Sequence, residues 1–217
     1  MTSGSILCLS AGLDSTVNLA AAVRRPGSVR LCLTFDYGQK AAKREAERAR
    51  KIARHYKVDW QLIRLPWLKA ITGTALVSKK PLPRLKASQL DDRRLTRRSA
   101  DAVWVPNRNG VFLNVAAAFA ESLGCREVVL GLNEEEGATF PDNTAAFGRA
   151  ATKAFRFSTR SGVRVVSYTA RMHKAEILNL GRWLEAPLHL VWPCYEGGPK
   201  PCGRCESCLR FRRASAS

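Results

Sequence analysis

The chain has 217 residues, of which 46% are hydrophobic, so it can bury a substantial core within one large domain. It contains no apolar run of membrane-spanning length and no recognisable secretory signal, so we expect a cytoplasmic protein without a membrane partner. Lys and Arg number 36 against 18 Asp and Glu, and this formal charge of +18 attracts anions such as nucleotides, nucleic acids or acidic proteins. Solvated basic faces without any partner would give the same composition.

Short apolar segments alternate with helical segments along the chain. Strands are expected over 5–10, 29–37, 58–65, 125–132 and 163–169. Helices are expected over 14–25, 39–56, 110–124, 144–158 and 173–184. Between them, 66–106 is Pro-containing and irregular, with room for short helices, and its basic part, 79–98, is a candidate for a mobile lid. This alternation predicts an α/β fold with a doubly wound, mostly parallel sheet.

The first predicted strand ends in the turn LSAGLDST, residues 9–16. In a parallel sheet, ligands bind outside the carboxyl ends of the strands, and backbone N–H groups at a helix N-terminus attract phosphate. Small residues leave that approach open, hydroxyl groups add donors, and Asp14 caps the helix or helps to hold a metal ion. A plain strand-to-helix turn with an Asp cap is the alternative from the local sequence. No Gly-Lys-Ser/Thr follows, so this is not a Walker loop.

Four of the seven cysteines cluster near the C-terminus, while the other three stand alone in apolar segments as expected core residues. The clustered ones are Cys194, Cys202, Cys205 and Cys208. In a cytoplasmic chain such spacing favours metal over disulfides, and four thiolates form a closed tetrahedral zinc site with a structural role. An iron–sulfur cluster and a redox role are the alternatives.

The turn at 9–16 resembles the pyrophosphate loop (PP-loop) of ATP pyrophosphatases, usually Ser-Gly-Gly-x-Asp-Ser. Ala11 stands where that family has Gly, which costs roughly 1 kcal/mol if the position needs a positive φ. Further segments in the same order resemble the QueC family, also called ExsB, over nearly the whole chain. They are FDYGQK (35–40), VPNRNGVFLNVAAAFAE (105–121), GLNEEEGATFPDN (131–143), HKAEILNLG (173–181) and WPCYEGGPKPCGRCESCLRF (192–211).

This resemblance implies a PP-loop domain of the adenine nucleotide alpha hydrolase type over 1–188 and a four-cysteine zinc-binding segment over 189–217 packed on it. It also implies an ATP-dependent carbon–nitrogen ligase that adenylates the carboxylate of 7-carboxy-7-deazaguanine. Ammonia then gives an amide, and a second activation dehydrates it to 7-cyano-7-deazaguanine (preQ0). Zn²⁺ and Mg²⁺ are the implied metals, ATP is a substrate, and a homodimer without nucleic acid is the implied assembly.

The resemblance also suggests which residues act. The catalytic candidates are Asp14, Ser15, Arg108 and Lys174. The ATP-binding candidates are Leu9, Ser10, Ala11, Gly12, Leu13, Asp14, Ser15, Thr16, Asp36, Tyr37 and Gln39. The candidates for binding the deazaguanine are Arg108, Asn109, Glu134, Glu135, Phe140 and Asp142, with the two glutamates facing its amino edge or a metal ion. Solvated loop acids and surface basic residues are the alternatives for these side chains.

Three further positions depart from the family pattern. Asn143 and Thr144 replace a Cys and an Arg, and Ala41 replaces a His. A pocket altered in this way also fits a QueC-like paralogue of antiphage operons, which joins the activated deazaguanine to a protein N-terminal amine. A PP-loop enzyme that modifies tRNA and a non-catalytic binding protein are further alternatives.

Overall fold

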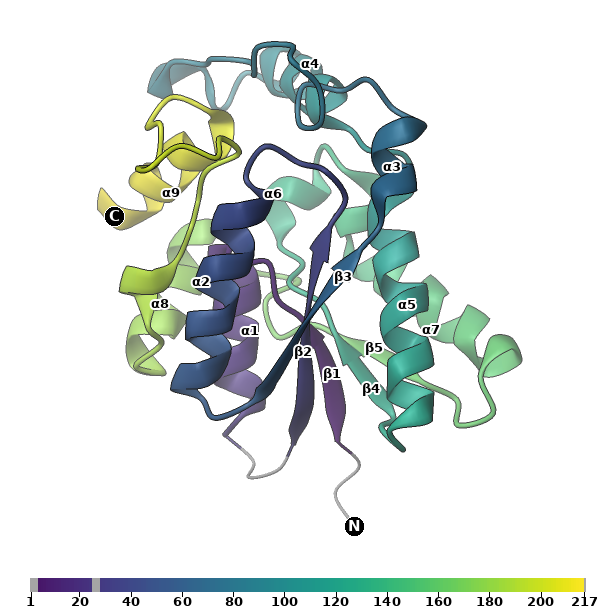
Figure 1. Ribbon diagram of the computed structural model, residues 1–217. Coiled ribbons are helices and arrows are strands. Elements are labelled where there is room, and N and C mark those ends of the chain that lie inside the picture. Colours follow the sequence, from purple (N-terminus) through teal and green to yellow (C-terminus); the bar gives the residue numbers. More distant parts are fainter. Residues whose placement is uncertain (1–3, 25–27, 217) are drawn as a thin grey trace.

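The computed structural model describes residues 4–24 and 28–216, and its centre is a parallel sheet (Figure 1). The strands run in the order β3-β2-β1-β4-β5, and every pairing is parallel. Their bounds are β1 Ser5–Cys8, β2 Val29–Asp36, β3 Asp59–Arg64, β4 Glu127–Val129 and β5 Arg164–Val166. The predicted doubly wound α/β fold is confirmed, and each strand lies within an expected segment.

Helices cover both faces of the sheet (Figure 1). One face carries α1 Leu13–Ala22, α2 Ala42–His55 and α8 Lys174–Trp183, and the other carries α5 Arg108–Ser122 and α7 Ala145–Ser158. Alternate strand residues serve the two layers, because Ile6 packs in the α5 layer and Leu7 in the α1–α2 layer. The expected end of the first helix at residue 25 lies outside the described residues.

The winding direction reverses next to the central strand. The chain builds β1, β2 and β3 outward on one side and then returns to add β4 and β5 on the other. The carboxyl ends of β1 and β4 therefore flank a topological switch point, where such sheets bind ligands.

The segment over 66–106 is more regular than expected. It contains α3 Pro66–Ala70, the 3₁₀ turn η1 Ala87–Gln89 and an eleven-residue helix, α4 Arg93–Val103. Asp92 caps α4 by accepting hydrogen bonds from the backbone N–H groups of residues 94 and 95, a signal available in the sequence. The segment arches over the carboxyl edge of the sheet (Figure 1).

The cysteine-rich segment also contains an unexpected helix, α9 Glu206–Ala216, which packs beside α8. The remaining short elements are α6 Glu134–Gly137, η2 Pro141–Asn143 and η3 Leu188–Leu190. Trp192 and three of the clustered cysteines belong to the apolar cluster that contains Leu7 and Leu9. The C-terminal segment thus shares the core of the sheet layer, while the division into units at residue 188 stays a prediction. Among the described residues, no helix combines the length and apolar character needed to cross a membrane.

Candidate functional site

A pocket opens at the carboxyl ends of β1 and β4, with the turn after β1 on its wall. Ala11 adopts a φ of 62°, which is the left-handed conformation that the comparison with the family's Gly suggested for this position. Its carbonyl accepts a 2.8 Å hydrogen bond from the N–H of Trp192, so the C-terminal segment holds the turn in place. Opposite, a Cβ on Gly131 would lie 2.7 Å from the backbone nitrogen of Ser15. Glycine is therefore needed where the chain after β4 crosses the turn.

Asp14 and Lys174 meet at the base of the pocket although 160 positions separate them. The Lys174 Nζ lies 2.5 Å from Asp14 Oδ2 and 2.8 Å from Glu136 Oε1. The Asn133 amide adds a 3.0 Å hydrogen bond to Asp14 Oδ2. Burial alone would lower the pKa of Lys174, but attraction by Asp14 and Glu136 raises it instead. The ammonium is thus held charged beside the turn.

The second oxygen of Asp14 is available for a ligand. Asp14 Oδ1 is buried and accepts no hydrogen bond from the described residues. Burial raises the pKa of Asp14, and the charge of Lys174 opposes this shift. Two carboxylates share one ammonium here, which leaves a negative excess when all three groups are ionised. A free carboxylate oxygen in such a place fits Mg²⁺, which is usually bound through one or two carboxylates together with substrate phosphates.

Arg108 supplies a second cation at the N-terminus of α5. Its guanidinium donates a 3.0 Å hydrogen bond to the Tyr37 hydroxyl and lies 5.7 Å from the centre of that ring. Asn109 also lines the pocket, and its side-chain amide donates to the Asp142 carbonyl at 2.9 Å. The Asp142 carboxylate in turn accepts the Asn109 backbone N–H at 3.2 Å. Asp142 thus supports the start of α5 from behind the pocket wall.

Most of the predicted site residues line this one pocket. They are Leu9, Ser10, Gly12, Leu13, Asp14, Ser15, Tyr37, Gln39, Arg108, Asn109, Phe140 and Lys174. The Thr16 hydroxyl instead donates to the Gly12 carbonyl within α1, and Asp36 accepts the Gly38 N–H in a local turn. Together with Ala11, whose side chain is fully buried, these two positions shape the backbone rather than the pocket surface.

Glu134 and Glu135 lie outside the pocket wall. Glu134 is exposed at the start of α6, and Glu135 binds the last helix. The carboxylate of Glu135 accepts hydrogen bonds from Arg210 at 2.9 Å, Arg213 at 3.3 Å and the Lys174 backbone N–H at 2.9 Å. Neither carboxylate is placed to meet the amino edge of a base in this pocket, because α6 turns only its third glutamate inward.

The pocket wall also includes residues that were not among the predicted site residues, such as Glu45, Glu136, Asn143 and Tyr195. The Asn143 amide donates to Glu136 at 2.9 Å, and its carbonyl accepts the Asn133 N–H at 3.1 Å. Asn143, which departs from the family pattern, therefore positions the Glu136 carboxylate that pairs with Lys174. Burial raises the pKa of Glu45 to about 7. Helical spacing offered a signal for Glu45, which lies one turn before the buried Ala49 on α2.

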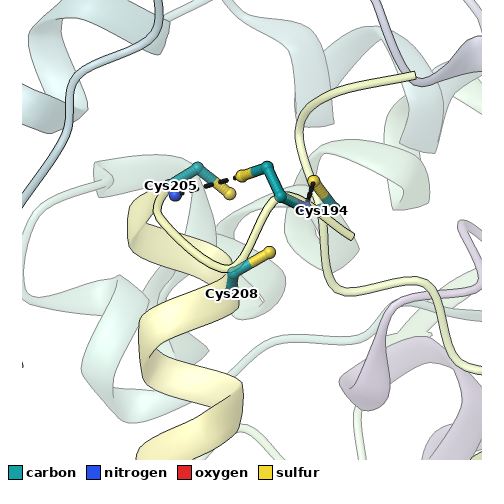
Figure 2. Close-up of side chains that lie close together, drawn as sticks. Cys194, Cys205 and Cys208 are labelled. Atoms are coloured by element: carbon teal, nitrogen blue, oxygen red, sulfur yellow. Dashed lines mark hydrogen bonds between the residues drawn. The ribbon is translucent and has the colours of Figure 1, made fainter. Parts of the chain in front are cut away.

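The cysteine sulfurs form a second candidate site beside the pocket. Cys194 lies in the loop after η3, Cys205 precedes α9, and Cys208 lies in its first turn, with their sulfurs turned toward one another (Figure 2). With Cys202, their four sulfurs all lie within 4.8 Å of one another. Tetrahedral zinc with Zn–S bonds near 2.3 Å separates its sulfurs by about 3.8 Å, so this set fits such an ion.

Backbone N–H groups support thiolates at this cluster. The N–H of Cys202 donates to Cys194 Sγ at 3.2 Å, and the N–H of Cys205 donates to Cys202 Sγ at 3.3 Å. Hydrogen bonds from the Cys205 and Cys208 thiols lower the pKa of Cys194, and the same hydrogen bonds raise the pKa of Cys205 and Cys208, so Cys194 carries the thiolate. A Cβ at Gly197 would lie 2.1 Å from the Lys40 carbonyl oxygen, so the loop between the ligands passes directly against the chain after β2.

Comparison with known proteins identifies the family. A family model described as "Queuosine biosynthesis protein QueC" matches residues 4–217. The chain belongs to the QueC family. It is 54% identical over 212 residues to the 7-cyano-7-deazaguanine synthase of Pelotomaculum thermopropionicum, covering 97% of this chain and 96% of the relative. The QueC relative of the same name from Methanosarcina mazei is 46% identical over 214 residues, covering 97% of this chain and 92% of the relative.

Solved structures share the fold at much lower sequence identity. The NMN synthetase of Francisella tularensis has a TM-score of 0.50 and 13% identity, covering 99% of this chain and 78% of that one. The U34-tRNA thiolase NcsA of Methanococcus maripaludis, with its 4Fe-4S cluster, has a TM-score of 0.50 and 15% identity, covering 99% and 65%. These neighbours confirm the predicted PP-loop type of fold and say nothing further of this QueC chain.

Proposed function

We propose that this QueC-type enzyme is an ATP-dependent ligase that converts 7-carboxy-7-deazaguanine into 7-cyano-7-deazaguanine. The observation that carries the proposal is the Asp14–Lys174–Glu136 cluster at the turn after β1, with Asp14 Oδ1 unpartnered among the described residues. Relatives named 7-cyano-7-deazaguanine synthase support the substrate and favour this activity over attachment to a protein amine. The tRNA-modifying alternative is supported here only by the similarity of its fold to that of a tRNA thiolase.

The turn and the two cations are suited to ATP. Ser10 and the first residues of α1 line the pocket, so the Ser10 hydroxyl and the N–H groups at this helix N-terminus are the groups that would bind phosphate oxygens. Lys174 and Arg108 neutralise the charge that spreads over the phosphates as the α–β bond breaks. Asp14 would hold Mg²⁺ through Oδ1, which would neutralise the phosphates and orient them.

The chemistry balances in two activations. A substrate carboxylate oxygen attacks the α-phosphorus, and pyrophosphate leaves. Ammonia attacks the acyl carbon, AMP leaves, and the nitrogen loses a proton to give the amide. The amide oxygen then attacks the α-phosphorus of a second ATP, and a second pyrophosphate leaves. Loss of AMP and of the two N–H protons gives the nitrile. In both activations this chain binds the phosphates and holds the attacking oxygen close to phosphorus.

The cysteine segment has a structural role in this proposal. Cys194, Cys202, Cys205 and Cys208 would bind one Zn²⁺ with all four positions filled, which leaves none open for catalysis. Elemental analysis of the purified chain should give about one zinc ion per chain. Iron with acid-labile sulfide would overturn the zinc assignment. The proposed homodimer is checked by light scattering.

The decisive experiment is a mass-spectrometric assay with ATP, Mg²⁺, ammonium and 7-carboxy-7-deazaguanine, following AMP and the base together. We expect the nitrile with two AMP formed for each base converted. AMP without amide or nitrile would show that the same acid is activated for another nucleophile. If the addition of 7-carboxy-7-deazaguanine does not increase AMP formation, the proposed function is overturned.

A further inference from the structure

Glu45 projects from the first turn of α2 onto the pocket wall. One carboxylate oxygen, Oε2, accepts a 2.7 Å hydrogen bond from the side-chain amide of Gln39. That amide is itself held in a fixed orientation, because its nitrogen also donates to the Phe35 carbonyl at 3.0 Å and its oxygen accepts the Tyr37 N–H at 2.9 Å. A carboxylate offers about four acceptor positions, so Glu45 keeps acceptor capacity toward the pocket.

The other carboxylates on the pocket wall are already engaged by a cation. Asp14 and Glu136 share Lys174, and Glu136 also accepts from the Asn143 amide. Within the described part of the chain, Glu45 is the pocket-lining carboxylate that forms no ion pair. Its protein partner is the neutral amide of Gln39. A half-buried acid arranged in this way is completed by donors from a ligand.

We infer that Glu45 binds the amino edge of the deazaguanine, namely its ring N–H and its exocyclic amine. The inference rests on the proposed function and moves this role from Glu134 and Glu135 to Glu45. The two neighbouring donors of a guanine-type edge match the two oxygens of a carboxylate. Adenine presents one donor beside an acceptor, so the same carboxylate disfavours ATP in the base site.

This placement also orients the reacting group. C7 is an atom of the five-membered ring, so its carboxyl group lies on the opposite side of the bicycle from the amino edge. With the amino edge at Glu45, the C7 carboxyl points away from α2 and across the pocket. Lys174, a cation that would meet an activated carboxylate, lines the same pocket, whereas Arg108 binds Tyr37 and its charge acts on Glu45.

The test compares Glu45→Gln with Glu47→Gln, which removes a more exposed acid on the same helix that pairs with Arg44. Each protein is assayed with 7-carboxy-7-deazaguanine and with an analogue that lacks the exocyclic amine. We expect Glu45→Gln to raise KM for the natural base by roughly ten- to a hundredfold, the value of hydrogen bonds to a charged group. The KM of Glu45→Gln for ATP should stay within about twofold of the wild-type value. All kinetic constants of Glu47→Gln should do the same.

The analogue gives a readout that a partly misfolded sample cannot imitate. The wild type should prefer the natural base over the analogue by roughly tenfold or more, and Glu45→Gln should lose most of that preference. An unchanged preference, or a rise in KM for ATP instead, would overturn the inference while leaving the proposed function intact. If the wild type itself does not bind the base, the proposed function fails, and the role of Glu45 falls with it.

Discussion

The four sulfurs of the cysteine segment come from one stretch of chain, 194–208, whereas the charged groups around Asp14 come from three separate elements. The sulfur cluster is thus arranged by local turns, and the proposed zinc ion would complete it. The Asp14 cluster is arranged by the whole sheet and its helices. From this difference we expect the loss of a cysteine to act mainly on the stability of the fold, and the loss of an Asp14-cluster side chain to act mainly on the proposed chemistry.

The largest effect is expected at Asp14. Asp14→Ala should lower AMP formation about a thousandfold or more, because it removes the free oxygen proposed for Mg²⁺ and a partner of Lys174. Asp59→Ala, at an exposed acid that begins β3, is the control and should retain full activity. Rates are measured as AMP release. Full AMP release by Asp14→Ala would place the phosphate site elsewhere.

The next effect concerns stability. Cys205→Ser should abolish stoichiometric zinc binding and lower the free energy of unfolding by about 3 kcal/mol or more, because one of four metal ligands is lost. Denaturant unfolding and elemental analysis measure the two quantities. Cys125→Ala changes a buried cysteine far from the cluster, and it should keep its zinc. Retention of zinc by Cys205→Ser would show that the sulfurs are not its ligands.

Glu135 tests the connection between the two regions. Glu135→Gln should destabilise the chain by about 2 kcal/mol, because the buried Arg210 loses one of its two carboxylate partners. The neighbouring Glu134→Gln removes an exposed charge and should change stability by less than about 0.5 kcal/mol. Equal effects in chemical denaturation would show that the contact between α6 and α9 contributes nothing.

The smallest effect is expected at Ala11. Ala11→Gly removes the strain of a positive φ at a residue with a side chain, which stabilises the fold. It also removes a buried methyl group and increases the conformational entropy of the unfolded chain, and both effects destabilise the fold. The free energy of unfolding should therefore change by less than about 1 kcal/mol. Thermal unfolding measures this difference. A larger loss would mean that the methyl group, rather than the backbone, holds the turn beneath Trp192.

The sequence predicted the sheet because strands and helices alternate, and it predicted the cysteine cluster because its ligands are neighbours in the chain. It also placed Asp14, Arg108 and Lys174 in segments that do meet at one pocket. The sequence could not show which of Glu134, Glu135 and Glu136 faces the pocket. Three consecutive glutamates in a one-turn helix carry no periodic pattern, so packing against α8 and α9 decides which one faces inward.

Glu45 shows the opposite case, where the pattern was readable. Ala49, Ile52 and Ala53 form the buried stripe of α2, and Glu45 extends that stripe by one turn. An acid on an otherwise apolar stripe marks either a functional group or a strained one.

The hydrogen bond from Trp192 to Ala11 has a consequence for biosynthesis. The turn at 9–16 leaves the ribosome early, whereas the residue that holds it is translated some 180 positions later. Until then the nascent chain carries the turn proposed to bind phosphate without the hydrogen bond that supports it. The growing polypeptide therefore cannot complete the proposed nucleotide site before its own C-terminal segment has emerged.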